Sequence, residues 1–166
     1  MRVLALNPPI FPRFSRAQRS PAVTKSGTLY YPIWLAYAAG VLEDAGFAVR
    51  LVDAPASGET VDELVALVRE WEPGLLVMDT STPSLANDLH VLEALKAARA
   101  EETLSLSPAL DAVARREYDY TVRDLARALG AGAPLADVAG LSYRAGDEIV
   151  HNPERPYIQD LDQLPF

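Results

Sequence analysis

The sequence predicts a doubly wound α/β domain with a mainly parallel sheet. Three short apolar runs, each typical of a strand buried on both faces, alternate with three longer segments of helical periodicity. Crossovers between parallel strands share one handedness, so the helices between such strands must cover both faces of the sheet. At 166 residues, about half of them apolar, the chain is long enough for one well-packed domain.

In the first strand–helix unit, an unusually long loop separates the strand from the helix. A strand is predicted over residues 3–6 (VLAL), and Pro8 and Pro9 end it because proline cannot donate to a sheet ladder. A helix then begins at Pro32 and ends before Gly46. The loop between them, residues 7–31, belongs to a length class that is usually functional or disordered.

Two further units follow, and then the alternation breaks. Strands are predicted over 48–52 and 75–78, and helices over 59–71 and 85–100, the last with Leu85, Leu89, Leu92 and Leu95 aligned. A fourth strand is expected directly after Ala100, but the next residues are polar and compatible with a helix. The sequence therefore predicts that one strand is missing at this point.

The rest of the chain predicts smaller elements: an edge strand over 109–114, a helix over 120–129, and a β-hairpin of 138–143 with 148–151 around Ala145-Gly146-Asp147. The final residues hold three prolines and suit a linker, or a strap along a neighbouring domain, better than a packed element. We therefore expect one domain over residues 1–151 and a linker over 152–166.

Composition narrows the classes of function. The formal charge of −8 argues against a nucleic-acid surface, which needs clustered Lys and Arg. The absence of cysteine excludes a disulfide framework and a cysteine-ligated iron–sulfur cluster within these residues. We expect a cytoplasmic protein, because there is neither an apolar run of about 18 residues nor a signal-peptide pattern. The most basic stretch is interpreted as a solvated loop, with contact to an anionic ligand group as the alternative: Arg13, Arg16, Arg19 and Lys25.

Ligands of open parallel sheets bind beyond the carboxyl ends of the strands, which here selects the loops 7–31, 53–58 and 79–84. The glycine fingerprints of dinucleotide and phosphate-loop sites are missing. Asp53 stands where a dinucleotide fold places its ribose acid, but helix capping is an equal alternative. The Asp79-Thr80-Ser81-Thr82 cluster holds more hydroxyls than a helix cap needs, which favours ligand contact.

Other candidate groups favour structural roles. His90 and His151 lack a second metal ligand at helical spacing, so we predict no metal site. Glu117 and Asp119 could form an acid–base pair, but the adjacent Arg115 and Arg116 favour a salt-bridged turn. No serine or cysteine nucleophile stands in an activating context, and no catalytic residue is predicted.

Several segments, taken in order, resemble one family. Residues 3–9 (VLALNPP), 31–46 (YPIWLAYAAGVLEDAG) and 49–54 (VRLVDA) are similar to the cobalamin-binding domain that precedes many radical SAM domains. The resemblance continues through four more segments: 77–84, 111–120, 140–144 and 152–166. The Tyr-Pro-x-Trp-Leu and Thr-Ser-Thr-Pro-Ser pieces look most like the branch that holds hopanoid-processing and anaerobic cyclase-like members.

This resemblance implies a Rossmann-like module that holds cobalamin and has no turnover alone. In the parent enzyme, S-adenosylmethionine and a four-iron four-sulfur cluster would lie in a C-terminal radical SAM domain that performs methyl transfer or a radical rearrangement. The residues that the resemblance places at the cofactor are Asn7, Pro8, Pro9, Tyr31, Asp53, Thr80, Ser81, Thr82, Pro83 and Glu117.

Two departures from the wider family affect these expectations. The D-x-H-x-x-G motif is missing, so the cobalamin is expected to bind base-off, without His90 or His151 on cobalt. The predicted loss of the fourth strand and its cofactor-holding loop after Ala100, if real, would lower the affinity sharply. A nucleotide-dependent enzyme and a receiver-like regulatory domain with Asp79 as phosphorylation site remain the alternatives on this fold.

Overall fold

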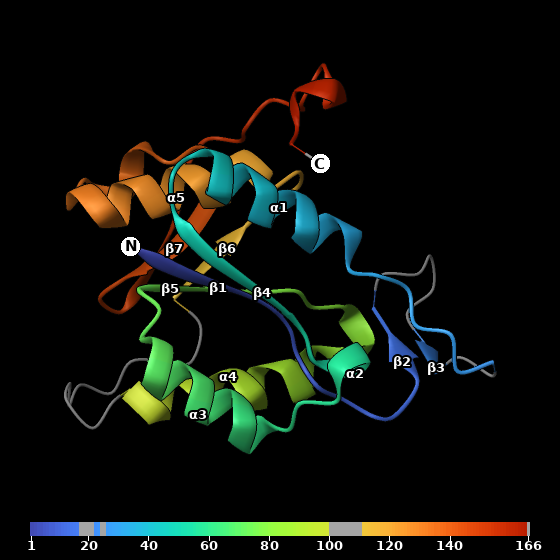
Figure 1. Cartoon of the computed structure of the whole chain (residues 1–166). Helices are drawn as coiled ribbons and strands as arrows, with labels where there is room; N and C mark the ends of the chain where they lie inside the picture. The colour runs from blue at the N-terminus through green and yellow to red at the C-terminus, as the bar shows by residue number, and fades with distance from the viewer. Residues whose placement is uncertain (17–21, 24–25, 100–110, 166) are drawn as a thin grey trace.

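The computed structural model describes residues 1–16, 22–23, 26–99 and 111–165 (Figure 1). Within them, β1 (Arg2–Asn7) is the centre of a three-stranded parallel sheet, with β4 (Ala48–Asp53) on one side and β5 (Leu75–Met78) on the other. Val3 is paired with Val49 of β4 and with Leu75 of β5, which sets the register across the sheet. The predicted parallel α/β architecture is confirmed.

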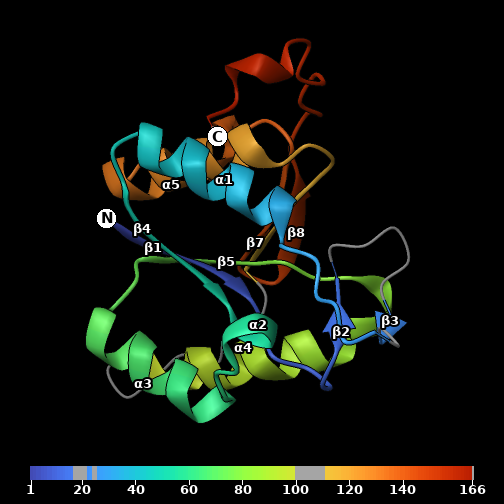
Figure 2. The same ribbon diagram turned by 45° about the vertical axis from the view of Figure 1, so that its right-hand side comes forward.

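Helices cover both faces of this sheet. α1 (Ile33–Asp44) and α5 (Asp119–Ala131) lie on one face, and α3 (Val61–Trp71) and α4 (Leu85–Arg99) lie on the other, as both views show (Figures 1 and 2). A short helix, α2 (Ala54–Ser57), follows β4. The helix predicted to start at Glu59 begins at Val61, because Thr60 and Glu63 form a capping box.

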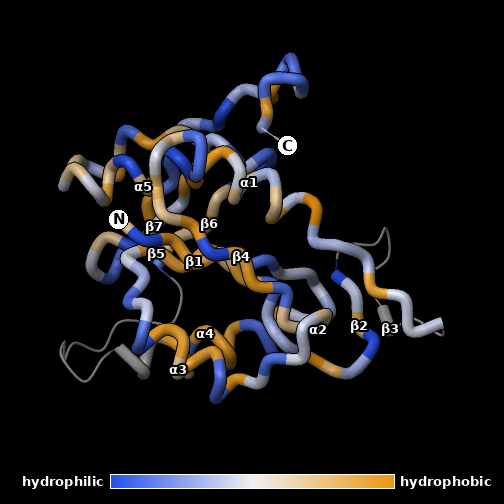
Figure 3. Tube along the Cα trace, in the orientation of Figure 1, coloured by the Kyte–Doolittle hydropathy of each residue, from blue (hydrophilic) through white to orange (hydrophobic). Residues whose placement is uncertain are grey.

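The residues of β1 alternate between the two helical layers. Leu4 and Leu6 pack with residues of α3 and α4, while Val3 and Ala5 pack with residues of α1 and α5. All four are fully buried, as a continuous apolar strand in a doubly covered sheet requires. Figure 3 shows the resulting hydrophobic band through β1 and along α3 and α4.

A second, antiparallel sheet packs on α5. It consists of β6 (Ala112–Ala114), β7 (Leu141–Ala145) and β8 (Glu148–His151), in that order. The predicted hairpin is confirmed, with Gly146 in the left-handed region at its turn (φ 63°). Of the predicted edge strand, residues 109–110 lie outside the described part, as does the position of the expected missing strand.

The loop 7–31 is partly ordered by a short antiparallel pair that the sequence did not predict. β2 (Phe14–Ser15) and β3 (Ala22–Val23) form it, pairing Phe14 with Val23 and Ser15 with Ala22. Of the four basic residues in this loop, Arg19 and Lys25 lie outside the described residues.

The segment 152–165 passes over α5 and then loops away above α1, with its end back near that helix (Figure 1). The Gly140 amide donates to the Pro153 carbonyl at 2.8 Å, and the Arg155 guanidinium binds Thr121 and Asp124 of α5. Further on, Pro165 lies so close to α1 that a Cβ on Gly40 would stand 3.3 Å from its carbonyl oxygen. Two short 3-10 turns, Leu135–Asp137 and Leu161–Gln163, complete this region. Whether the segment also leads to a further domain stays a prediction.

No helix among the described residues has both the length and the apolar character that a membrane span requires.

Candidate functional site

The strand order places a topological switch point between β1 and β5. From β1 the chain crosses through α1 to β4, and from β4 it crosses through α3 to β5 on the opposite side of β1. The loops that leave the carboxyl ends of β1 and β5 therefore diverge, and ligands of open parallel sheets bind at such a divergence. Asn7 ends β1, and Asp79 follows β5, with its amide donating to the Leu6 carbonyl at 2.9 Å.

Arg16 fills the space between these two loops. Its side chain is only 1% exposed, so the interpretation of this residue as part of a solvated loop is wrong. One guanidinium nitrogen (Nη1) donates to Asn7 Oδ1 at 3.0 Å and to the Pro8 carbonyl at 2.6 Å. Nε donates to Ser84 Oγ at 3.2 Å and to Asp88 Oδ2 at 3.3 Å, and Nη2 pairs with Asp88 Oδ1. The buried charge is thus both paired and hydrogen-bonded.

Asp88, on the first turns of α4, gathers donors from the third loop. Besides Arg16, its Oδ2 accepts from Thr80 Oγ1 at 2.8 Å and from Ser84 Oγ at 2.6 Å. The buried face of this helix region runs through Ser84, Asp88, Val91 and Leu95, whereas Leu85 is exposed. Of the predicted alignment, Leu95 is buried, Leu89 and Leu92 are half-buried and Leu85 is exposed, because the buried face begins with the polar residues Ser84 and Asp88.

The second loop joins through the end of β1. Asn7 Nδ2 donates to Asp53 Oδ1 at 2.7 Å, while Asn7 Oδ1 accepts from Arg16. One continuous hydrogen-bonded network, from Asp53 through Asn7, Arg16 and Asp88 to Thr80, therefore spans all three loops selected from the sequence.

Burial shifts the acid–base properties of this end of the sheet. Desolvation raises the pKa of Asp53 and of Asp79 above the ordinary value, and the nearby Arg16 charge partly opposes both shifts. Burial, reinforced by the charge of Asp79, also raises the pKa of the Tyr118 hydroxyl. Within the described residues, this buried hydroxyl has no hydrogen-bond partner. Sequence reasoning missed Tyr118 as a candidate.

Several exposed apolar side chains belong to the segments that follow the strands of this network. They come from the loop after β1, the first turn of α1 and the start of α4, which all lie at the carboxyl edge of the sheet: Phe11, Tyr30, Tyr31, Ile33, Trp34 and Leu85. We call this group the apolar rim. Exposed apolar residues concentrated in one region usually mark a binding surface. Tyr30 is tied to the network region, because its amide donates to Ser15 Oγ at 3.2 Å.

The candidate residues from the sequence take different positions. Pro8 and Pro9 offer backbone carbonyls, to Arg16 and to Asn87 respectively. Ser81 Oγ lies 2.7 Å from Ser84 Oγ and Thr80 donates to Asp88, so two hydroxyls of the predicted cluster are bonded to the residues that follow it. Thr82 and Pro83 are exposed on the 3-10 turn Thr82–Ser84.

Glu117 lies outside the network. Its carboxylate accepts from the Ile158 amide at 2.7 Å and so holds the segment 152–165. The predicted salt-bridge partner of Arg116 is wrong, since Arg116 pairs with Glu154 at 2.6 Å instead. The two histidines are also elsewhere: His90 is exposed beside Glu93, and His151 Nδ1 lies 2.8 Å from Ser142 Oγ on the antiparallel sheet.

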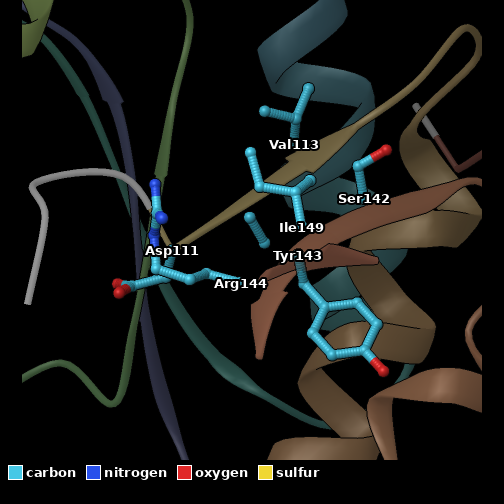
Figure 4. Close-up of a pocket in the computed structure, with 7 residues that line it drawn as sticks. Asp111, Val113, Ser142, Tyr143, Arg144 and Ile149 are labelled. Atoms are coloured by element: carbon cyan, nitrogen blue, oxygen red, sulfur yellow. The ribbon is translucent and has the colours of Figure 1, made fainter. Parts of the chain in front are cut away.

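A shallow depression on the antiparallel sheet was not expected from the sequence. Val113 of β6 and Ile149 of β8 lie on the same face of this sheet, beside Ser142 and Arg144 of β7 (Figure 4). Its other lining residues are Asp111, Ala112 and Tyr143. None of the seven belongs to the network at the switch point.

Comparison with known sequences identifies a family for this chain. The B12 binding domain family matches residues 19–106, more than half of the chain. An uncharacterized methyltransferase of Pyrococcus horikoshii is 26% identical over 155 residues, 84% of this chain and 34% of that protein. The anaerobic magnesium-protoporphyrin IX monomethyl ester cyclase of Synechocystis is 30% identical, over 98% of this chain and 34% of that protein. The chain spans about a third of these relatives.

Solved structures share the fold. The cobalamin-dependent S-adenosylmethionine radical enzyme OxsB, with aqua-cobalamin and S-adenosylmethionine bound, superposes with a TM-score of 0.72 at 17% identity, covering 94% of this chain and 22% of that one. The radical S-adenosylmethionine methyltransferase TsrM of Kitasatospora setae gives 0.63 at 15% identity, covering 92% and 30%. These comparisons favour neither a nucleotide-dependent enzyme nor a receiver domain. The chain belongs to the B12-binding domain family.

Proposed function

We propose that this chain binds cobalamin at the carboxyl ends of β1, β4 and β5, as the cofactor-holding module of a radical SAM enzyme. The observation that carries the proposal is the network at the switch point, bordered by the apolar rim, in a chain of the B12-binding family. Methyl transfer or a radical rearrangement would be performed by the parent enzyme.

The residues present fit such a cofactor. A corrin ring offers a broad apolar surface edged by amide side chains, so its site needs apolar contacts together with hydrogen-bonding groups. The apolar rim supplies the first, with Tyr31 and Trp34 more than half exposed. The Asp79 carboxylate supplies the second, and the exposed Thr82 adds a hydroxyl.

The chain's own residues would hold and orient the cofactor rather than react. When bound, cobalamin supplies a cobalt centre that can carry a methyl group. His90 and His151 lie outside the network, which supports base-off binding without a protein histidine on cobalt. Because the sequence has no cysteine, a cysteine-ligated cluster and its S-adenosylmethionine would have to come from another domain.

The experiment is retention of the corrin. The protein is incubated with hydroxocobalamin, separated from free ligand by desalting, and its visible spectrum is recorded. We expect a corrin spectrum at close to one equivalent per chain. No retained corrin would overturn the proposal for residues 1–166.

A matched pair of variants locates the site. Ile33→Asn removes an exposed isoleucine of the apolar rim, and Ile149→Asn removes an exposed isoleucine of the antiparallel sheet, at similar exposure. We expect Ile33→Asn to weaken retention and Ile149→Asn to leave it unchanged. The reverse pattern would place the ligand on the antiparallel sheet instead.

A further inference from the structure

We propose that Arg16 is a positioning residue for this site: its ion pair with Asp88 holds the three strand-end loops in the arrangement that binds the cofactor. The inference rests on the proposed function and adds to it a residue that acts on the loops rather than on the ligand. Arg16 contacts Asn7 after β1 and Ser84 after β5 directly, and it reaches Asp53 after β4 only through Asn7.

The first step is the sequence separation that the Arg16–Asp88 ion pair bridges. Arg16 and Asp88 are 72 residues apart in sequence, one in the loop after β1 and the other on α4. Their side chains are 1% and 2% exposed, so the contact is fully withdrawn from solvent. The loop after β1 is long, and a long loop without internal anchors samples many conformations. The pair fixes this loop near its middle.

The second step is the directional nature of the contacts. A guanidinium presents its donors as a rigid planar fork, and all three nitrogens of Arg16 are engaged. They face Asn7 and the Pro8 carbonyl on one side and Ser84 and Asp88 on the other. A lysine ammonium could keep the charge but could not meet both sides at once. The geometry therefore sets the separation of the β1 and β5 loops.

The third step connects this anchor to the apolar rim. Ser15, which directly precedes Arg16, is itself buried and accepts a hydrogen bond from the Tyr30 amide. When Arg16 is held, Ser15 is held, and the backbone next to Tyr31 takes a defined position. The far end of the loop is thus held through Ser15, beside the buried pair, in addition to the β2–β3 pairing.

Positioning of this kind affects affinity because ordering a flexible loop on binding costs free energy, and a loop that is already ordered avoids that cost. Loss of the pair should therefore weaken ligand binding even though Arg16 has no donor left for a ligand on two of its three nitrogens. The strands beneath should keep their pairing, since β1, β4 and β5 are joined by their own ladder.

Three variants of the full chain test the inference: Arg16→Met, Arg16→Lys, and the double change Arg16→Met with Asp88→Asn. The double variant removes both members of the buried pair, so it should fold even if Arg16→Met does not. Arg2→Met, which removes an arginine at the opposite end of β1, is the control. The readouts are amide hydrogen exchange of the ligand-free protein and titration with hydroxocobalamin followed by its visible spectrum.

We expect the double variant to exchange amides of residues 8–16, 28–31 and 79–84 at least tenfold faster than wild type, with β1, β4 and β5 still protected. Its cobalamin dissociation constant should rise at least tenfold, Arg16→Lys should recover part of both effects, and Arg2→Met should change neither. Unchanged loop exchange, or wild-type affinity in a variant with mobile loops, would overturn the inference. If wild type itself retains no corrin, the proposed function fails, while hydrogen exchange still decides whether Arg16 orders the loops.

Discussion

The two ends of strand β1 are each tied to the rest of the molecule by an arginine and a carboxylate, in opposite environments. At the amino end, Arg2 pairs with Glu72 at 3.1 Å, with side chains 44% and 66% exposed. At the carboxyl end, Arg16 pairs with Asp88 in a site closed to solvent. An exposed pair contributes little to stability, whereas a buried pair that loses one partner leaves a costly unpaired charge. The comparison shows that the fold depends on a single polar contact at the carboxyl end of β1, the Arg16–Asp88 pair, and not at the amino end.

Removal of the carboxylate at the buried end should have the largest effect. Asp88→Ala leaves the Arg16 charge unpaired and removes the acceptor of Thr80 and Ser84, so we expect a loss of about 3–5 kcal/mol in the free energy of unfolding. Chemical denaturation followed by circular dichroism measures it. A loss as small as that of an exposed pair would show that the two ends of β1 do not differ as described.

Asn7→Ala should have the next largest effect. It removes the donor to Asp53 and one acceptor of Arg16, both in a buried setting, at an expected cost of about 1–3 kcal/mol. Asn87→Ala is the comparison: its amide donates to the Pro9 carbonyl and to Asp88 Oδ1 but contacts neither Arg16 nor Asp53, so its loss should cost less. Equal denaturation midpoints for the two variants would contradict a network that runs through Asn7.

Asp79→Asn should change stability in the opposite direction at neutral pH. Burial raises the pKa of Asp79 above its ordinary value of 3.8, so the folded state disfavours the ionised carboxylate more than the unfolded state does. Wild type therefore loses stability as the pH rises through the raised pKa and regains it as the pH falls. We expect Asp79→Asn to melt at a higher temperature than wild type at pH 7, with the difference vanishing toward pH 3.8. A difference that grows on acidification would refute this sign.

Glu72→Ala, at the exposed end, should have the smallest effect. We expect a loss of at most about 1 kcal/mol, which added salt removes because the pair is open to solvent. The loss caused by Asp88→Ala should persist at the same ionic strength. Denaturation of both variants at low and high salt tests the contrast, which fails if the two respond alike.

Much of the fold was accessible from the sequence because it depends on local patterns. The buried strand 3–6 and the half-buried strand 75–78 are recognisable as apolar runs, and Pro32 and Gly46 mark the ends of α1. The hairpin was recognisable from Gly146 between two alternating runs. The bounds of β6 were harder to predict, because a three-residue edge strand has too few residues for a clear alternating pattern.

The site was only partly accessible, because its contacts join distant segments. Asn7, Asp53 and Thr80 could be selected as residues at strand ends, but the burial of Arg16 depends on a partner 72 positions away. One signal was present: Asp88 lies three residues before Val91 and seven before Leu95, on the face that the helix buries. An acidic residue on such a face implies a cationic partner. No comparable sequence pattern indicated the contact of Glu117 with Ile158.

The long separation between Arg16 and Asp88 also has a kinetic consequence. Arg16 and Asp88 are 72 residues apart and follow β1 and β5, so their pair is a non-local contact that we expect to form late in folding. Changes at such positions mainly accelerate unfolding and leave the folding rate nearly unaltered. The strand-end loops of this domain would then be the last region to assemble and the first to open, while the sheet beneath them stays intact.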